Sequence, residues 1–270
     1  MTSSYIRQSL PSTADLPYSD GMPVDNEDQN LLPNLLLHLL THLWADRMDW
    51  FFGVDMAVYH ETGISPKIPV VPDAFLSLGV ERKRGGKSRL SYAVWEDGAV
   101  PTMVLEMVSH KPGKEYDKKL LLYRDLGVLY YVVYNPEYWQ RDQHNPFEVY
   151  KLESGEYRLQ SGEPYWMPEV GLGIGRYQTE FGKLPQEILT WYDERGNRHF
   201  NEAEQERLRA ERERIWAEQA RVRAERAEAA AEQERARAEQ ERVRAEQERV
   251  RAERFEAILR AQGIEPDDLV

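Results

Sequence analysis

The stretch from residue 201 to residue 260 contains no glycine, no proline and no lysine, and consists almost entirely of Ala, Glu, Gln and Arg. These four residue types favour helix, and no helix-ending residue occurs before Gly263 and Pro266. The sequence therefore predicts one long helix over residues 201–261, followed by a short tail, residues 262–270. All other glycines and prolines lie before residue 201, so a separate globular part precedes the helix.

This predicted helix repeats every seven residues. The pattern Ala-Glu-Gln-Glu-Arg-(Ala/Val)-Arg occurs at 231–237, 238–244 and 245–251. One apolar column recurs at the sixth position of each repeat, and an alanine column at the first position lies on nearly the opposite face. The position four residues after the first column reads Arg or Gln from Arg212 to Arg254, whereas a strict coiled coil has a second apolar column there. Two interpretations stay open: a homo-oligomeric coiled coil, or a single charged helix that acts as a spacer and is held by Glu–Arg pairs within the helix.

The globular part has the pattern of an α/β domain. Leucines at helical spacing after an acidic first turn predict the first helix. Apolar or alternating runs predict strands, and a second helix ends at Gly127. In chain order, the predicted elements are a helix at 26–45, strands at 51–59, 68–78 and 101–108, a helix at 114–126, a strand at 128–134, and further strands to about residue 174. We assign the domain to residues 25–195, after an N-terminal lead of residues 1–24.

Composition excludes several classes of function. The chain has no cysteine, which removes disulfides, thiolate metal sites and cysteine nucleophiles. Its net charge of −12 argues against indiscriminate binding to nucleic acid. Because no apolar run approaches the length of a membrane span and the first twenty residues lack a signal-peptide pattern, we expect a cytoplasmic protein with no membrane association.

Two carboxylates occur where burial is expected. Asp73 follows a proline within an apolar strand, and Glu106 lies near the end of the next one. Carboxylates on neighbouring buried strands repel each other unless a cation or a lysine lies between them, and Lys119 follows on the next helix. Asp, Glu and Lys converging in this way can support Mg²⁺-dependent phosphodiester hydrolysis. The alternative is a turn-capping Asp and an ordinary Glu–Lys salt bridge.

Four segments carry a resemblance to a known family. They are residues 15–21 (DLPYSDG), 71–80 (VPDAFLSLGV), 104–109 (VLEMVS) and 119–131 (KLLLYRDLGVLYY). In order and spacing they resemble the Uma-type putative restriction endonuclease family of the PD-(D/E)XK nuclease superfamily, over roughly residues 10–190.

The resemblance implies a restriction-endonuclease-like core, in which a mixed sheet is flanked by helices, followed here by the long C-terminal helix. It implies that Asp73 and Glu106 bind the metal ion and that Lys119 assists catalysis, with Lys118 as the rival lysine. It also implies that Glu27, on the first helix, adds a metal contact.

The chain departs from the pattern at three positions. The usual superfamily lysine, two residues after the second acid, is replaced by Val108. Glu115 stands where family members usually have Asp, and Asn30 stands where many have His.

These observations predict a DNA endonuclease that uses Mg²⁺, with Mn²⁺ as the alternative ion, and that self-associates through its C-terminal helix. The alternative function is a catalytically inactive nuclease fold that binds nucleic acid or a protein partner through the long helix.

Overall fold

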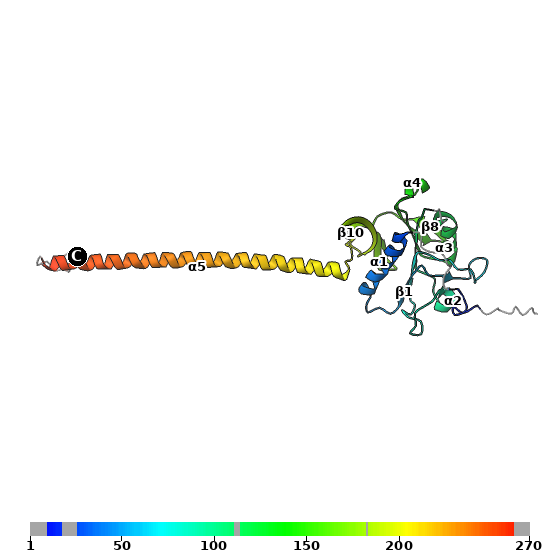
Figure 1. The fold of residues 1–270 in the computed structure, drawn as a ribbon, viewed down its shortest axis with the longest axis horizontal. Helices are drawn as coiled ribbons and strands as arrows, with labels where there is room; N and C mark the ends of the chain where they lie inside the picture. The colour runs from blue at the N-terminus through cyan, green and yellow to red at the C-terminus, as the bar shows by residue number, and fades with distance from the viewer. Residues whose placement is uncertain (1–9, 18–25, 111–113, 182, 262–270) are drawn as a thin grey trace, which may run out of the picture. The chain divides into compact units, whose positions relative to one another are not determined.

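The computed structural model describes residues 10–17, 26–110, 114–181 and 183–261 (Figure 1). The chain divides into two compact units, Met1–Asn201 and Glu202–Val270, called here the head and the tail. The head contains a mixed sheet with helices and the tail is a long helix, so the predicted fold class is confirmed.

The main sheet of the head has six strands in the order β1-β3-β5-β6-β7-β8. The pair β5–β6 is parallel, and the other four pairs are antiparallel. Every residue of β5 and β6 is buried, as their mostly apolar sequences, interrupted only by Glu106, predict for strands that are covered on both faces. The strands are β1 (Trp50–Val54), β3 (Ala74–Leu78), β5 (Met103–Met107), β6 (Tyr130–Tyr134), β7 (Phe147–Glu153) and β8 (Glu156–Leu159).

Helices cover the two faces of this sheet. The crossover from β5 to β6 forms a π-helical turn, η1 (Glu115–Lys119), and then α3 (Leu120–Leu126), which packs Tyr123 in one hydrophobic cluster with Val104 and Tyr131. Helix α1 (Glu27–Leu43) packs its leucines in the cluster on the other face. Asn26 caps α1, because its side chain accepts a hydrogen bond from the backbone N–H of Gln29 at 3.0 Å.

Two smaller sheets complete the head. Strands β9 (Tyr165–Met167), β10 (Leu172–Phe181) and β11 (Leu184–Tyr192) form an antiparallel sheet, and β2 (Val58–Tyr59) pairs with β4 (Tyr92–Ala93). Two short helices, α2 (Val94–Asp97) and α4 (Trp139–Asp142), lie in connections. Of the further strands predicted to about residue 174, β7 and β8 extend the main sheet, whereas β9 and β10 form a sheet of their own with β11.

The predicted strand at 51–59 is also divided. Asp55 adopts a positive φ of 46°, which ends β1, and β2 then pairs in another sheet. In the predicted N-terminal lead, the described residues 10–17 pack on the head: Leu16 is buried, and Tyr59 donates a hydrogen bond to the carbonyl of Pro17 at 2.5 Å.

The tail consists of α5 (Glu202–Ala261), 60 residues long and without a buried residue (Figure 1). Ion pairs three or four residues apart lie along its surface, such as Arg221 with Glu218 and Glu225. None of the helices in the described part of the chain combines the length and the apolar character that crossing a bilayer requires.

Candidate active site at the β3–β5 end

The two predicted acids lie at the same end of adjacent strands. Ala74, the first residue of β3, is paired with Leu105 of β5, and the same antiparallel register places Asp73 opposite Glu106. Successive side chains of a strand alternate between the faces of the sheet, so Asp73 lies on the face of Phe75, and Glu106 lies on the face of Val104. Both of those apolar residues belong to the cluster under α3. The sequence predicted Asp73 within a strand at 68–78, but the observed strand β3 begins at Ala74, so Asp73 lies just before it.

Asp73 is held by backbone contacts. Its Oδ2 accepts a hydrogen bond from the backbone N–H of Met107 at 2.6 Å, and its carbonyl accepts one from the backbone N–H of Asp55 at 3.1 Å. The half-buried side chain is therefore fixed at the end of β5, beside Glu106.

Glu106 is 1% exposed, and both of its carboxylate oxygens have partners. Lys119 Nζ donates to Oε2 at 2.7 Å, and the hydroxyl of Tyr123 donates to Oε1 at 2.6 Å. The lysine and the tyrosine are four residues apart and lie on one face of the helix, where both reach the same carboxylate. Sequence reasoning missed the role of Tyr123, although its spacing from Lys119 was a usable signal.

The charges of these groups act strongly on each other. Burial and then the charge of Glu106 hold the pKa of Asp73 well above its usual range. Burial also raises the pKa of Glu106, against the opposing effects of Lys119 and Tyr123. Burial lowers the pKa of the Lys119 ammonium, but the charge and hydrogen bond of Glu106 outweigh it, and the pKa of Lys119 lies above its ordinary value. The arrangement therefore stabilises a protonated lysine beside Glu106, and it makes Asp73 and Glu106 resist losing their protons together.

The π-helical turn determines which lysine reaches the site. The backbone N–H of Lys119 bonds to the carbonyl of Lys114, five residues earlier, at 3.1 Å. Helix α3 begins directly after this wider turn, at Leu120. Lys118 is exposed on the turn, whereas the side chain of Lys119 extends to Glu106. π-helical turns are rare and are frequent at functional sites. Glu115, the first residue of the turn, is 5% exposed, and its charge raises the pKa of both Glu106 and Lys119.

The structure gives no support to Glu27 as a metal contact. Glu27 is exposed at the start of α1, whereas Gln29 is buried and its Nε2 donates to the carbonyl of Met107 at 3.4 Å. Within the described ranges, no group of three or more His, Cys, Asp or Glu side chains is arranged to hold a metal ion. The role of Glu27 stays a prediction, and Gln29 donates a hydrogen bond from α1 to the end of β5.

The basic loop at residues 82–89 does not adjoin the two acids along β3. It follows the end of β3 that is opposite to Asp73. Arg84 pairs with Glu96, and Arg89 forms a buried ion pair with Asp97 at 2.7 Å. Two of the five basic residues in this loop are therefore paired with acids of the head.

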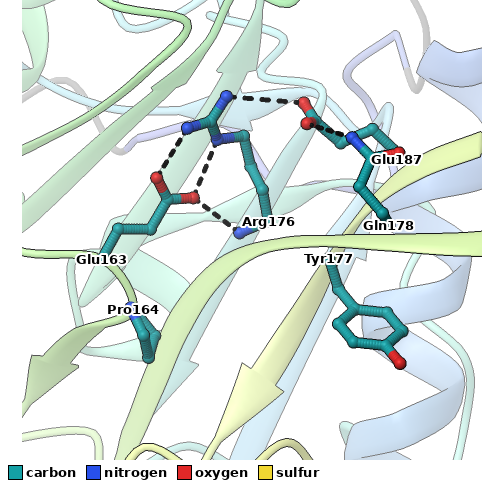
Figure 2. A pocket seen from close by; sticks show the side chains of 6 residues that line it. All are labelled: Glu163, Pro164, Arg176, Tyr177, Gln178 and Glu187. Carbon is teal, nitrogen blue, oxygen red and sulfur yellow. Dashed lines mark hydrogen bonds and ion pairs between the residues drawn. The ribbon is translucent and has the colours of Figure 1, made fainter.

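A separate hollow of about 300 Å³ lies against β10 and β11 (Figure 2). Figure 2 shows Arg176 between Glu163 and Glu187, with N–O distances of 2.8 Å and 3.7 Å. Gln178 donates to Glu187 at 2.8 Å. Glu163, Arg176, Gln178 and Glu187 are thus paired within the hollow, which contains none of the predicted site residues.

The model of the family Uma2, described as "Putative restriction endonuclease", matches residues 13–178. No curated protein matches the chain. One solved structure that is similar is that of a putative nuclease belonging to DUF820 from Anabaena variabilis, with 13% sequence identity and a TM-score of 0.39, over 56% of this chain and 79% of that chain.

Proposed function

Because this chain belongs to the Uma2 family of putative restriction endonucleases, we propose that its head is a Mg²⁺-dependent endonuclease that hydrolyses phosphodiester bonds of DNA. The observation that carries the proposal is the placement of Asp73 opposite Glu106, with Lys119 bonded to Glu106. We propose these three side chains as the catalytic site, and the two acids as the metal ligands.

The two acids suit a hard divalent cation. Mg²⁺ is commonly held by one or two carboxylates together with waters and substrate phosphate oxygens, so a pair of acids is a sufficient protein contribution. A cation between Asp73 and Glu106 would also relieve the repulsion that raises the pKa of Asp73. When bound, Mg²⁺ would supply Lewis-acid polarisation of the phosphate and a more acidic bound water. The same oxygen ligands would accept Mn²⁺.

The chain's own groups would orient the reacting atoms. The backbone N–H of Met107 fixes Asp73, and Tyr123 fixes one oxygen of Glu106. The side chain of Lys119 is positively charged and 28% exposed. Its ammonium can therefore contact solvent or a phosphate oxygen as well as Glu106. A lysine so placed stabilises negative charge that develops on the phosphate during hydrolysis.

The test is nicking of supercoiled plasmid by the full-length protein. We expect relaxed product with Mg²⁺ or Mn²⁺, none with EDTA, and none with Glu106→Gln, which keeps the shape of the side chain but removes its negative charge. The exposed Glu137→Gln serves as the matched control and should nick like the wild type. Equal traces from the wild type and Glu106→Gln would show a contaminating nuclease and would contradict the proposal.

One observation favours the second candidate function, a nuclease fold that binds nucleic acid without cutting it. Both oxygens of Glu106 already have a donor, an arrangement that also describes a stable structural ion pair. This function predicts that the wild type retards DNA in a gel with EDTA and leaves it uncut with either metal ion.

Tyr123→Phe is expected to weaken metal binding without unfolding the head. The substitution keeps the ring, which is 1% exposed, and removes the hydroxyl that orients Glu106. Loss of a partner that orients a metal ligand typically lowers metal affinity by about 10–100-fold. The measurement is the Mn²⁺ concentration that gives half-maximal nicking. Tyr157→Phe removes the hydroxyl of a half-buried tyrosine packed against the same cluster, and it should leave that concentration unchanged.

A further inference from the structure

Helix α5 has one apolar column that nothing covers in the described part of the chain. The column repeats every seven residues, and three of its larger members are well exposed: Ile215 at 49%, Val243 at 45% and Val250 at 52%. Leu208 and Val222 are partly exposed. Its members are Leu208, Ile215, Val222, Ala229, Ala236, Val243, Val250 and Ala257. A seven-residue apolar repeat of this length can supply one of the two columns of a coiled-coil seam.

The residues that flank the column are sorted by charge. The position three residues after each of its first seven members is always glutamate: Glu211, Glu218, Glu225, Glu232, Glu239, Glu246 and Glu253. The position one residue after the column is mostly arginine: Arg209, Arg223, Arg237, Arg244 and Arg251. If the column is heptad position d, the glutamates occupy g and the arginines occupy e, the two positions that face a partner helix.

Within the helix, the glutamates at g form ion pairs, whereas the central arginines at e do not. Glutamates of the g row bond to arginines on their other side, as Glu239 does to Arg242 and Glu246 to Arg249. Among residues 202–261, no carboxylate lies within ion-pair distance of the e-row Arg237, Arg244 or Arg251. This row of cations beside the seam is therefore available to a partner.

We propose that α5 pairs with α5 of a second copy of this chain, parallel and in register. In a parallel pair, each g residue faces the e residue five positions later on the other helix. Glu232, Glu239 and Glu246 would then face arginines in both directions across the seam: Arg237, Arg244 and Arg251 of the second copy. An antiparallel pair would instead place g beside g and e beside e, which brings glutamate to glutamate and arginine to arginine.

The second seam column makes the association weak. It contains Gln233, Gln240 and Gln247 in the centre and arginines toward the ends. Polar residues at such positions specify register at a cost in stability. The dimer is therefore concentration-dependent, and added salt weakens it because its interhelical ion pairs are exposed. If the head cuts DNA as proposed above, the parallel pair supplies two active sites, one for each strand of a duplex.

Sedimentation of the full chain tests the pairing. The wild type should approach twice the 31.6 kDa of one chain as concentration rises. The triple variant Arg237→Glu, Arg244→Glu, Arg251→Glu should stay at the mass of one chain, and so should the reciprocal variant Glu232→Arg, Glu239→Arg, Glu246→Arg. Mixing the two variants should restore the doubled mass, which also shows that both are folded.

Disulfide formation tests the orientation, because the chain has no cysteine of its own. Gln240→Cys places a thiol in the seam, where a parallel in-register pair brings it to the same residue of the second copy, so we expect rapid covalent dimer on mild oxidation. Ala238→Cys places the thiol on the outer face of the helix and should form at least tenfold less dimer.

Three results would overturn the proposal. They are a single-chain mass for the wild type at all concentrations, a doubled mass for each charge-reversed variant alone, and equal oxidation of the two cysteine variants. Plasmid nicking is a separate readout: loss of pairing with metal-dependent nicking retained would leave the proposed function standing.

Discussion

Asp73→Asn is expected to abolish metal-dependent nicking and, at neutral pH, to make the head more stable. The asparagine can still accept the hydrogen bond from Met107 N–H, but it cannot supply a negative charge to a cation. The metal ion stabilises the charge of the transition state by several kcal/mol, and losing that stabilisation lowers the rate by about 10²–10³-fold. The measurement is the initial rate of plasmid nicking at saturating Mg²⁺.

The stability gain follows from the sign of the pKa shift. Burial, and then Glu106, raises the pKa of Asp73 in the folded head above the unfolded value of 3.8, so the folded state binds the proton more tightly. Stability is therefore lost as pH rises from the unfolded pKa toward the folded one, and asparagine removes that loss. At pH 7 we expect a gain of about 0.5–2 kcal/mol, a usual size for a stabilising substitution. Below about pH 4 the gain should disappear, because Asp73 is then protonated in both states.

Urea denaturation of the wild type and Asp73→Asn at pH 7 and pH 3.5 checks this pH dependence. Asp46→Asn is the matched control, because Asp46 is exposed in the turn after α1. A variant that is less stable than the wild type at pH 7 would show that the carboxylate of Asp73 contributes to the fold.

Lys119→Met is expected to reduce nicking by about 10²-fold or more, whereas Lys118→Met should leave the rate within twofold of the wild type. Only Lys119 bonds to Glu106, and Lys118 is exposed on the same turn. Removing one group that stabilises charge in a transition state commonly costs 10²–10³ in rate. The two substitutions make the same chemical change one residue apart, so a difference in their nicking rates reflects only the position of the lysine that is removed.

Loss of the lysine also leaves Glu106 buried without a cation. Breaking a buried ion pair costs about 3–5 kcal/mol when the remaining charge persists. Since the pKa of Glu106 is already raised by burial, we expect the carboxyl to take up a proton, which limits the cost. A folded circular-dichroism spectrum with the nicking rate lost assigns the effect to chemistry. Equal rates for the two methionine variants would exclude Lys119 from catalysis.

The sequence was sufficient to predict that the two acids lie on adjacent strands, although Asp73 precedes β3 and does not lie within it. Apolar runs around Asp73 and Glu106 indicated adjacent buried strands, and buried strands have a strict alternation that fixes which side chains share a face. The choice between Lys118 and Lys119 required coordinates, because the π-helical turn changes the helical phase by a residue and periodicity arguments assume an α-helix.

Other features depended on tertiary contacts that local patterns do not encode. The family resemblance pointed to Glu27, yet α1 turns Gln29 toward β5, since the rotation of a helix is set by the packing of its leucines. The alternation at 51–59 was recognised, but the positive φ at Asp55 and the change of sheet after it were not. The chemistry of Tyr123 was hidden because an aromatic residue on an inner helix face usually only fills space.

The crossover between β5 and β6 has a consequence for how this site tolerates change. Glu106, Lys119 and Tyr123 all lie between the start of β5 and the end of α3, so one short continuous stretch supplies most of the reactive groups, and only Asp73 comes from farther away. Contacts of such low sequence separation need little loop closure to form. Insertions elsewhere in the head can therefore lengthen its loops while this stretch keeps the lysine and tyrosine on their glutamate.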